Sequence, residues 1–152
     1  MSQLLDLDAI RAEFLNQDFD EVTYTLEAEK LAAYARTCGE LAECYTDPEH
    51  PDFQASPTFT SSLRPGRRLP EGFPQLPGMG MDAGKAVAPI LPIRPGVTIS
   101  GKTHLHDVYS KTGRSGRMTF LVTRMELYDD AGEQLATADT RVVIREKPDA
   151  DE

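Results

Sequence analysis

The chain has 152 residues, 39% of them hydrophobic and 27% charged, which is typical of one soluble globular domain with its own hydrophobic core. Its formal charge of -9 at pH 7 argues against nucleic-acid binding, which requires a positive surface, but it allows a small anionic ligand. No apolar run approaches the length of a membrane span, and acids stand where a signal peptide carries basic residues, so we expect a cytoplasmic protein without a membrane partner.

The N-terminal part of the chain predicts a helix, a strand and a second helix. Residues 6–16 carry apolar side chains at helical spacing, and residues 21–26 alternate between apolar and polar side chains as a strand does. Residues 27–39 again place apolar side chains on one helical face, with acids in the first turn and Gly39 as the expected end of the helix.

The middle of the chain is rich in proline, because nine of the eleven prolines lie between Pro48 and Pro92. Residues 42–80 therefore predict loops with one or two helical turns, around residues 58–63. A loop-rich insertion of this length inside a compact domain is usually either functional or poorly ordered.

From Val87 onward the chain predicts β structure. Three segments have strand character and are joined by Gly- and Asp-rich hairpin signals: ILPIRPGVTISGKTHLHDVYS, GRMTFLVTRMELYDD and EQLATADTRVVIRE. The second segment carries apolar side chains on both faces: Met118, Phe120 and Val122 against Leu121, Met125 and Leu127. We therefore expect one face of the sheet to be covered by a helix and the other by a partner chain or an acyl ligand. The elements together predict an α+β domain that forms an oligomer.

Several of these segments are similar to one known family. The quoted strands, the segment FDEVTYTLEAEKLAAYARTCGE and the Ser-Pro-Thr-Phe of residues 56–59 resemble the N-terminal MaoC-like dehydratase domain. This domain belongs to the hot-dog superfamily of (R)-specific enoyl-CoA hydratases and acyl dehydratases. The most telling pieces are the Arg-Pro-Gly of residues 94–96, before a long strand, and the Asp-Val-Tyr of residues 107–109, before the turn at residues 111–117.

The resemblance implies a hot-dog fold, a long bent antiparallel sheet wrapped around a helix, over residues 19–146. Residues 1–18 are then an N-terminal helical segment and residues 147–152 a solvated tail. Two hot-dog units pair side by side, so the implied partner is a second MaoC-like hot-dog subunit or a second copy of this chain. The implied substrates are acyl thioesters of coenzyme A or of acyl carrier protein, and no cofactor is expected.

Catalytic relatives carry the pattern Gly-Asp-x-Asn-Pro-x-His, whose Asp and His activate water at the α,β position of the thioester. In this chain Gly39 keeps the glycine, while Glu40 stands at the Asp position and Tyr45 at the His position. Ala42 and Glu43 replace the Asn and the Pro. The longer acid moves the carboxylate, and a tyrosine, with an ordinary pKa of about 10, is a poor proton shuttle near neutral pH.

Three functions stay open on this pattern. We favour a non-catalytic hot-dog half that lines the acyl-binding site of an enoyl-thioester hydratase or dehydratase and pairs with a chain carrying the Asp and the His. The second is a self-sufficient homodimeric hydratase or thioesterase that uses Glu40 and Tyr45 as its catalytic pair. The third is an acyl-CoA-binding scaffold without turnover. In the first and third, Glu40 is a surface acid at a helix end and Tyr45 a packing residue.

Two kinds of residue are candidates for binding the substrate. Basic clusters, which suit the phosphates of coenzyme A or an acidic carrier protein, comprise Arg64, Arg67 and Arg68, and then Lys111, Arg114 and Arg117. The alternative is solvated charge in turns, which we adopt for Lys111 and leave open for the arginines. Candidate walls of an acyl channel are residues 57–63, with Pro57 and Phe59, and the segment with Met79 and Met81.

The histidines and cysteines give weaker signals. His104 and His106 alternate on one face of a strand, but no third metal ligand is evident, so we expect two surface imidazoles rather than a metal site. His50 reaches a site only if the proline-rich loop folds over it. Cys38 and Cys44 predict two reduced thiols, at least one of them buried.

Overall fold

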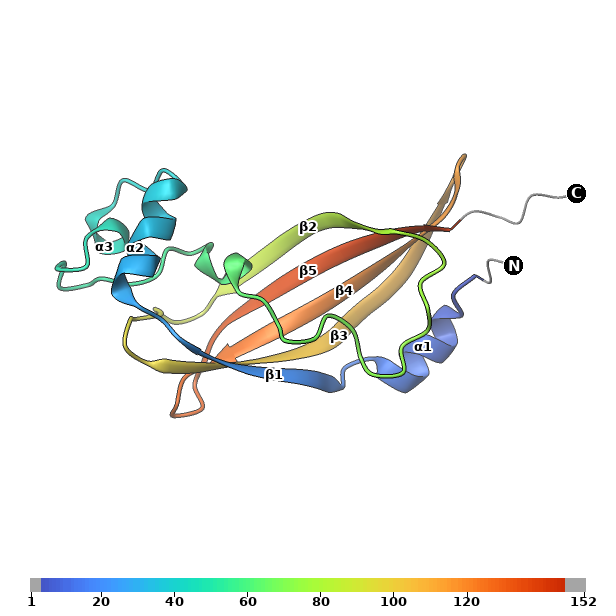
Figure 1. The fold of residues 1–152 in the computed structure, drawn as a ribbon, viewed down its shortest axis with the longest axis horizontal. Coiled ribbons are helices and arrows are strands. Elements are labelled where there is room, and N and C mark those ends of the chain that lie inside the picture. The colour runs from blue at the N-terminus through green and yellow to red at the C-terminus, as the bar shows by residue number, and fades with distance from the viewer. Residues whose placement is uncertain (1–3, 147–152) are drawn as a thin grey trace, which may run out of the picture.

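A five-stranded antiparallel sheet forms the centre of the structure, a computed structural model that describes residues 4–146 (Figure 1). The strands are β1 (Asp18–Thr25), β2 (Gly80–Pro89), β3 (Thr98–Gly113), β4 (Gly116–Tyr128) and β5 (Gln134–Glu146). The helices are α1 (Leu7–Phe14), α2 (Ala28–Thr37), α3 (Glu43–Thr46) and the 3-10 helix η1 (Phe59–Ser62). The fold is α+β, as predicted, and no helix among residues 4–146 is long and apolar enough to cross a membrane.

The strands lie in the order β1-β3-β4-β5-β2, so that β1 and β2 form the two edges. A bulge in β3 shifts its register between Leu105 and Asp107. Because a bulge inserts one extra residue, the side chains of Leu105 and Val108 both reach the same apolar cluster although their spacing would place them on opposite faces of a regular strand. The bulge therefore lets apolar side chains from both halves of β3 face the same core.

Both apolar clusters of the core lie on one face of the sheet, which we call the inner face. The cluster at the end nearest α2 includes Leu31, Phe59, Ile99, Met125 and Leu127. The cluster at the opposite end includes Ile10, Phe14, Leu105, Leu121 and Ile144, with Leu69, Phe73 and Leu76 packed against it. The core is thus divided along the length of the strands.

The helix α2 covers only one end of the inner face. Its buried residues Leu31 and Ala32 join the first cluster, and α2 and α3 lie together beyond that end of the sheet (Figure 1). The helix α1 lies at the other end, and η1 contacts β2 and β5 between the two. The middle of the inner face is therefore covered by η1 and the loop that follows it, not by a long central helix.

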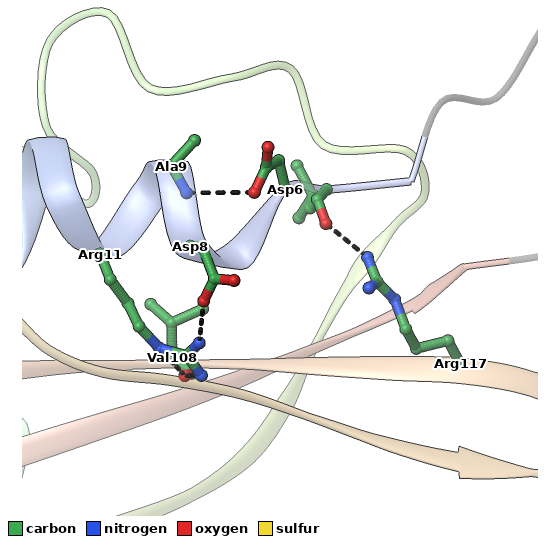
Figure 2. A network of polar contacts seen from close by, with 7 residues as sticks. Asp6, Asp8, Ala9, Arg11, Val108 and Arg117 are labelled. Atoms are coloured by element: carbon green, nitrogen blue, oxygen red, sulfur yellow. Dashed lines mark hydrogen bonds and ion pairs between the residues drawn. The ribbon is translucent and has the colours of Figure 1, made fainter.

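Two arginines tie the N-terminal segment to the sheet (Figure 2). Arg11 donates from its Nε atom to the carbonyl oxygen of Val108 at 3.2 Å. Arg117 donates from Nη2 to the carbonyl oxygen of Leu5 at 2.6 Å. The N-terminal helix is held against the sheet by these bonds as well as by the apolar side chains it contributes to the core.

The outer face of the sheet also carries apolar side chains. Val122 is buried, and Phe120 stacks on Tyr109 with ring centroids 4.9 Å apart and an angle of 8° between the planes. Neither Val122 nor Phe120 belongs to the two inner-face clusters. The expectation that a partner chain or an acyl ligand covers this face stays a prediction.

Most of the predicted elements are confirmed. The helices expected in residues 6–16 and 27–39, the strand in residues 21–26 and the helical turn around residues 58–63 are all present, with ends that differ by a few residues. The predicted tail of residues 147–152 lies outside the described residues.

The start of β2 and the burial of the cysteines differ from expectation. We predicted loops up to Gly80 and β structure only from Val87, but β2 begins at Gly80. We also expected at least one buried thiol, whereas Cys38 is exposed and Cys44 is half-buried. Cys38 follows the last residue of α2 as its C-terminal cap and so lies just beyond the face that the helix buries.

Candidate functional site

The segment that matches the catalytic pattern begins where α2 ends. Gly39 adopts a φ of 79°, a left-handed conformation that favours glycine, and this ends the helix. The N–H of Glu40 then donates to the carbonyl oxygen of Ala35 at 3.0 Å. The short helix α3 follows and carries Tyr45, so Glu40 and Tyr45 lie together at the end of the molecule formed by α2 and α3 (Figure 1).

The environment of Tyr45 works against proton transfer. Partial burial, followed by the neighbouring Cys44, Glu40 and Asp52, raises the pKa of the Tyr45 hydroxyl above its ordinary value. A proton shuttle near neutral pH requires the opposite shift. The negative charge of Glu40 is therefore close enough to act on Tyr45, but it acts in the direction that keeps the phenol protonated.

Arg94 holds the loop that faces this segment. Its guanidinium donates to the carboxylate of Asp52 at 2.7 Å and to the carbonyl oxygen of Phe53 at 3.1 Å. Arg94 belongs to the Arg-Pro-Gly motif of the family resemblance, and here its contacts are structural. Sequence reasoning missed this role because its partners lie in a proline-rich stretch that has no regular pattern.

A small cavity lies on the inner face between the two apolar clusters. It has a volume of about 20 Å³, and its lining includes Thr103, Thr123, Thr140, Thr60 and Lys85. Glu40 and Tyr45 are not among the residues that line it. The segment that resembles the catalytic loop and this cavity therefore form separate regions of the chain.

The predicted walls of an acyl channel are not brought together. Phe59 is buried and meets the ring of Tyr34 edge-on, with centroids 5.3 Å apart, while Pro57 is exposed. Met79 and Met81 are 83% and 48% exposed at the start of the edge strand β2. Of this set, only Phe59 lies within the core, and the role of the four residues in an acyl channel stays a prediction.

The predicted basic residues divide into three positions. Arg64, Arg67 and Arg68 are exposed in the loop after η1, where Arg64 stands between two residues that line the inner-face cavity. Arg114 is exposed in the β3–β4 hairpin, at the end of the sheet opposite α2 (Figure 1). The guanidinium of Arg117 is already paired with Glu146, which is completely buried.

The two strand histidines form a pair on the outer face. The Nε2 atom of His104 lies 3.1 Å from Nδ1 of His106, and its Nδ1 lies 3.7 Å from the carboxylate of Asp18. His104 is only 7% exposed, so the expectation of two surface imidazoles was wrong for this residue. Burial lowers its pKa below the ordinary value, although the carboxylates of Glu126 and Asp18 act in the opposite direction. Within residues 4–146, no group of three His, Cys, Asp or Glu side chains could hold a metal ion.

His50 lies in the loop held by Arg94. Its Nδ1 atom accepts a hydrogen bond from the N–H of Asp52 at 3.1 Å. The loop therefore uses His50 to stabilise its own turn, and His50 is not among the residues that line the inner-face cavity.

Comparison with known proteins places the fold and the family. In structure, the chain is similar to a MaoC-like dehydratase of Phytophthora capsici, with a TM-score of 0.64, 22% identity and coverage of 93% of this chain but 53% of that one, so it spans about half of that protein. It is similar to the ChsH1-ChsH2 complex of Mycobacterium tuberculosis, with a TM-score of 0.62, 15% identity and coverage of 95% and 91%. It is also similar to the HadBC (3R-hydroxyacyl-ACP dehydratase) complex of the same organism, with a TM-score of 0.57, 15% identity and coverage of 85% and 99%.

The sequence comparisons agree with this fold. A UPF0336 protein of Streptomyces coelicolor is 28% identical over 142 residues, which cover 84% of this chain and 89% of that protein. The model of the family described as "FAS1-like, dehydratase domain region" matches residues 13–138, which is most of the chain. The chain therefore belongs to the family of the FAS1-like dehydratase domain region, and its fold is the hot-dog fold that MaoC-like dehydratases share.

Proposed function

We propose that this chain is the non-catalytic subunit of a hot-dog hydratase or dehydratase that acts on acyl thioesters, and that it pairs with a second hot-dog chain supplying the catalytic Asp and His. The observation that carries this proposal is the set of residue replacements between Gly39 and Tyr45, together with the pKa of Tyr45. The acid is lengthened to Glu40, the histidine is replaced, and the replacing Tyr45 has a raised pKa. A phenol held in its protonated form is a weak general base at neutral pH.

The edge strand β2 supports pairing with a second chain. It is exposed along most of its length, and four exposed apolar residues lie in it or next to its ends: Met81 within the strand, and Met79, Ile90 and Leu91 beside it. An unpaired strand edge with apolar neighbours favours association with another sheet. Among the similar structures, HadBC and ChsH1-ChsH2 are complexes named for two components, which supports a hetero-complex over a homodimer.

We place the carrier end of the thioester at Arg64, Arg67 and Arg68. These three arginines are exposed in an acidic chain, and Arg64 stands in sequence between Leu63 and Pro65, which line the inner-face cavity. Arg67 forms a long, exposed ion pair of 3.8 Å with Glu71, a contact that a phosphate can replace. Arg67→Glu together with Arg68→Glu should weaken acyl-CoA binding in a salt-dependent manner, and unchanged affinity would show that the cluster is merely solvated.

The deciding experiment is an assay of the purified chain alone, and then of the chain with the hot-dog protein that co-purifies with it from its own host. The substrates are trans-2-enoyl-CoA esters of increasing chain length. We expect no hydration by the chain alone and hydration by the complex. Glu40→Gln and Tyr45→Phe variants should leave the activity of the complex within about twofold, because neither side chain takes part in the chemistry.

Two other outcomes would replace the proposal. Turnover by the chain alone that is lost in Glu40→Gln identifies a self-sufficient hydratase or thioesterase. Binding of acyl-CoA without turnover, alone and with every hot-dog partner, identifies a scaffold.

A further inference from the structure

An open groove lies where the end of α1, the start of β1 and the loop after η1 meet. Its volume is about 340 Å³. Its lining has an apolar part, formed by Phe14, Phe19 and Pro70, and three acids. The acids are Glu13, Asp18 and Glu71. Among residues 4–146, no lysine or arginine lines this groove. It therefore combines aromatic rings with carboxylates, a lining that suits a cationic side chain.

The negative charge of the groove is largely uncompensated. Glu13 is exposed on α1 and forms no ion pair within the described part of the chain. Asp18 lies 3.7 Å from Nδ1 of His104, but burial lowers the pKa of this imidazole, so it is mostly uncharged at pH 7. Glu71 has one exposed contact, at 3.8 Å, with Arg67. The groove therefore keeps a negative potential at neutral pH.

The tip of the β3–β4 hairpin carries the opposite charge. The pair of β4 and β5 residues nearest the hairpin is Arg117 with Glu146, so residues 112–116 project beyond β5 (Figure 1). Lys111 and Arg114 in this hairpin are exposed, and neither has an ion-pair partner among residues 4–146. In a chain with a formal charge of -9, two such cations on a projecting hairpin attract an acidic surface.

The groove and the hairpin lie at the same end of the molecule. Both α1 and the β3–β4 hairpin stand at the end of the sheet opposite α2 (Figure 1). A contact in which the hairpin of one copy enters the groove of a second copy can therefore be reciprocal. A two-fold axis between the two features makes both contacts at once, and such closed two-fold pairs are the commonest form of self-association.

We propose that the acidic groove is the docking site for the β3–β4 hairpin of a second copy of this chain, with the guanidinium of Arg114 placed against Phe19 and the groove carboxylates. A guanidinium group stacks on aromatic rings and forms paired hydrogen bonds with carboxylates, so one side chain uses both parts of the lining. The contact leaves the edge strand β2 free for a different partner. It goes beyond the proposed function and does not depend on it.

The test measures self-association of the full chain by sedimentation equilibrium, with Met81→Glu and Ile90→Glu present throughout to remove any contribution of the β2 edge. We expect dimers with a dissociation constant on the order of 10 to 100 µM, because the contact is small and charged. Arg114→Glu and Glu13→Arg should each weaken the dimer about tenfold, because like charges then face each other. Both substitutions in one chain should restore most of the affinity. Raising the salt from about 50 mM to about 500 mM should weaken the original contact.

Glu21→Arg is the matched control. Glu21 is an exposed acid of β1 that does not line the groove, so this variant should associate as before. The contact is overturned by a chain that stays monomeric, by single charge reversals without effect, by an equal loss in Glu21→Arg, or by a combined variant that associates no better than the single ones. A monomeric chain that loses its co-purified partner in Glu13→Arg assigns the groove to that partner and also overturns the contact. No measurement uses an acyl ester, so the proposed function is tested separately.

Discussion

Arg117 forms an ion pair with Glu146 whose carboxylate is completely shielded from solvent. The same carboxylate accepts a hydrogen bond from the N–H of Leu5 at 3.2 Å, and the same guanidinium donates to the carbonyl oxygen of Leu5. One pair of charged side chains therefore joins the start of β4, the end of β5 and the segment before α1. A buried charge that loses its partner is strongly destabilising, whereas an exposed pair contributes little.

We predict that Arg117→Met lowers the free energy of unfolding by about 3 kcal/mol, because it leaves the Glu146 carboxylate buried without a counter-charge. The double variant Arg117→Met with Glu146→Leu should lose much less. Urea denaturation followed by circular dichroism measures both. Arg114→Met, an exposed arginine in the same hairpin, should change stability by less than about 0.5 kcal/mol, and an equal loss there would contradict a specific role for the buried pair.

The second prediction concerns pH and His104. Burial lowers the pKa of His104 below its ordinary value of 6.5, so the unfolded chain takes up a proton at a higher pH than the folded chain does. The stability that His104 contributes is present above pH 6.5 and is lost as the pH falls through the lowered pKa. The urea midpoint should therefore drop between pH 7.5 and pH 5.0, and His104→Gln should make this drop smaller. His50→Gln serves as the control, and a drop that is unchanged in His104→Gln contradicts the assignment.

The third prediction follows from the positions of the two cysteines. Cys38 is exposed and Cys44 is half-buried, so both thiols should react with iodoacetamide in the native protein, and Cys38 should react faster. Mass spectrometry of the labelled protein over time, with Cys38→Ser to isolate the slower thiol, gives the two rates. Labelling of Cys38 only after addition of denaturant would show that the end of α2 is covered, for example by a partner chain.

The sequence was sufficient for elements with a strong local pattern. The three long segments of strand character and the glycine-containing turns that join them predict β3, β4 and β5 and their antiparallel pairing, because hairpin partners are neighbours in the chain. The strand β2 was partly missed for a physical reason. Its sequence, GMDAGKAVAP, has two glycines, a proline and few β-branched residues, and its partner β5 follows long after it in the chain. An edge strand tolerates such a composition because only one side needs backbone hydrogen bonds.

In the candidate site, too, features with a local sequence pattern were predicted and features without one were missed. The position of the Glu40 segment after α2 followed from local pattern and family resemblance. The pairing of Arg117 with Glu146, and that of Arg94 with Asp52, depend on residues far apart in sequence, and nothing local marks them. His104 was misplaced on the surface because polar residues are mostly exposed, whereas its burial here is set by the neighbouring strands and by His106.

The last prediction concerns the edge strand β2 as the contact with the partner. Replacing Met81 and Ile90 by Glu places two charges beside an edge that we expect to pair with another sheet, and charge on an edge strand opposes such pairing. The double variant should weaken association with the co-purified hot-dog chain, or with a second copy, by at least about tenfold, while its circular dichroism spectrum stays unchanged. Ala131→Glu, in the exposed turn between β4 and β5, is the control and should associate normally. Size-exclusion chromatography with light scattering measures the assemblies, and a double variant that assembles as the unmodified chain does would place the interface elsewhere, with the outer-face pair Tyr109 and Phe120 as the next surface to alter.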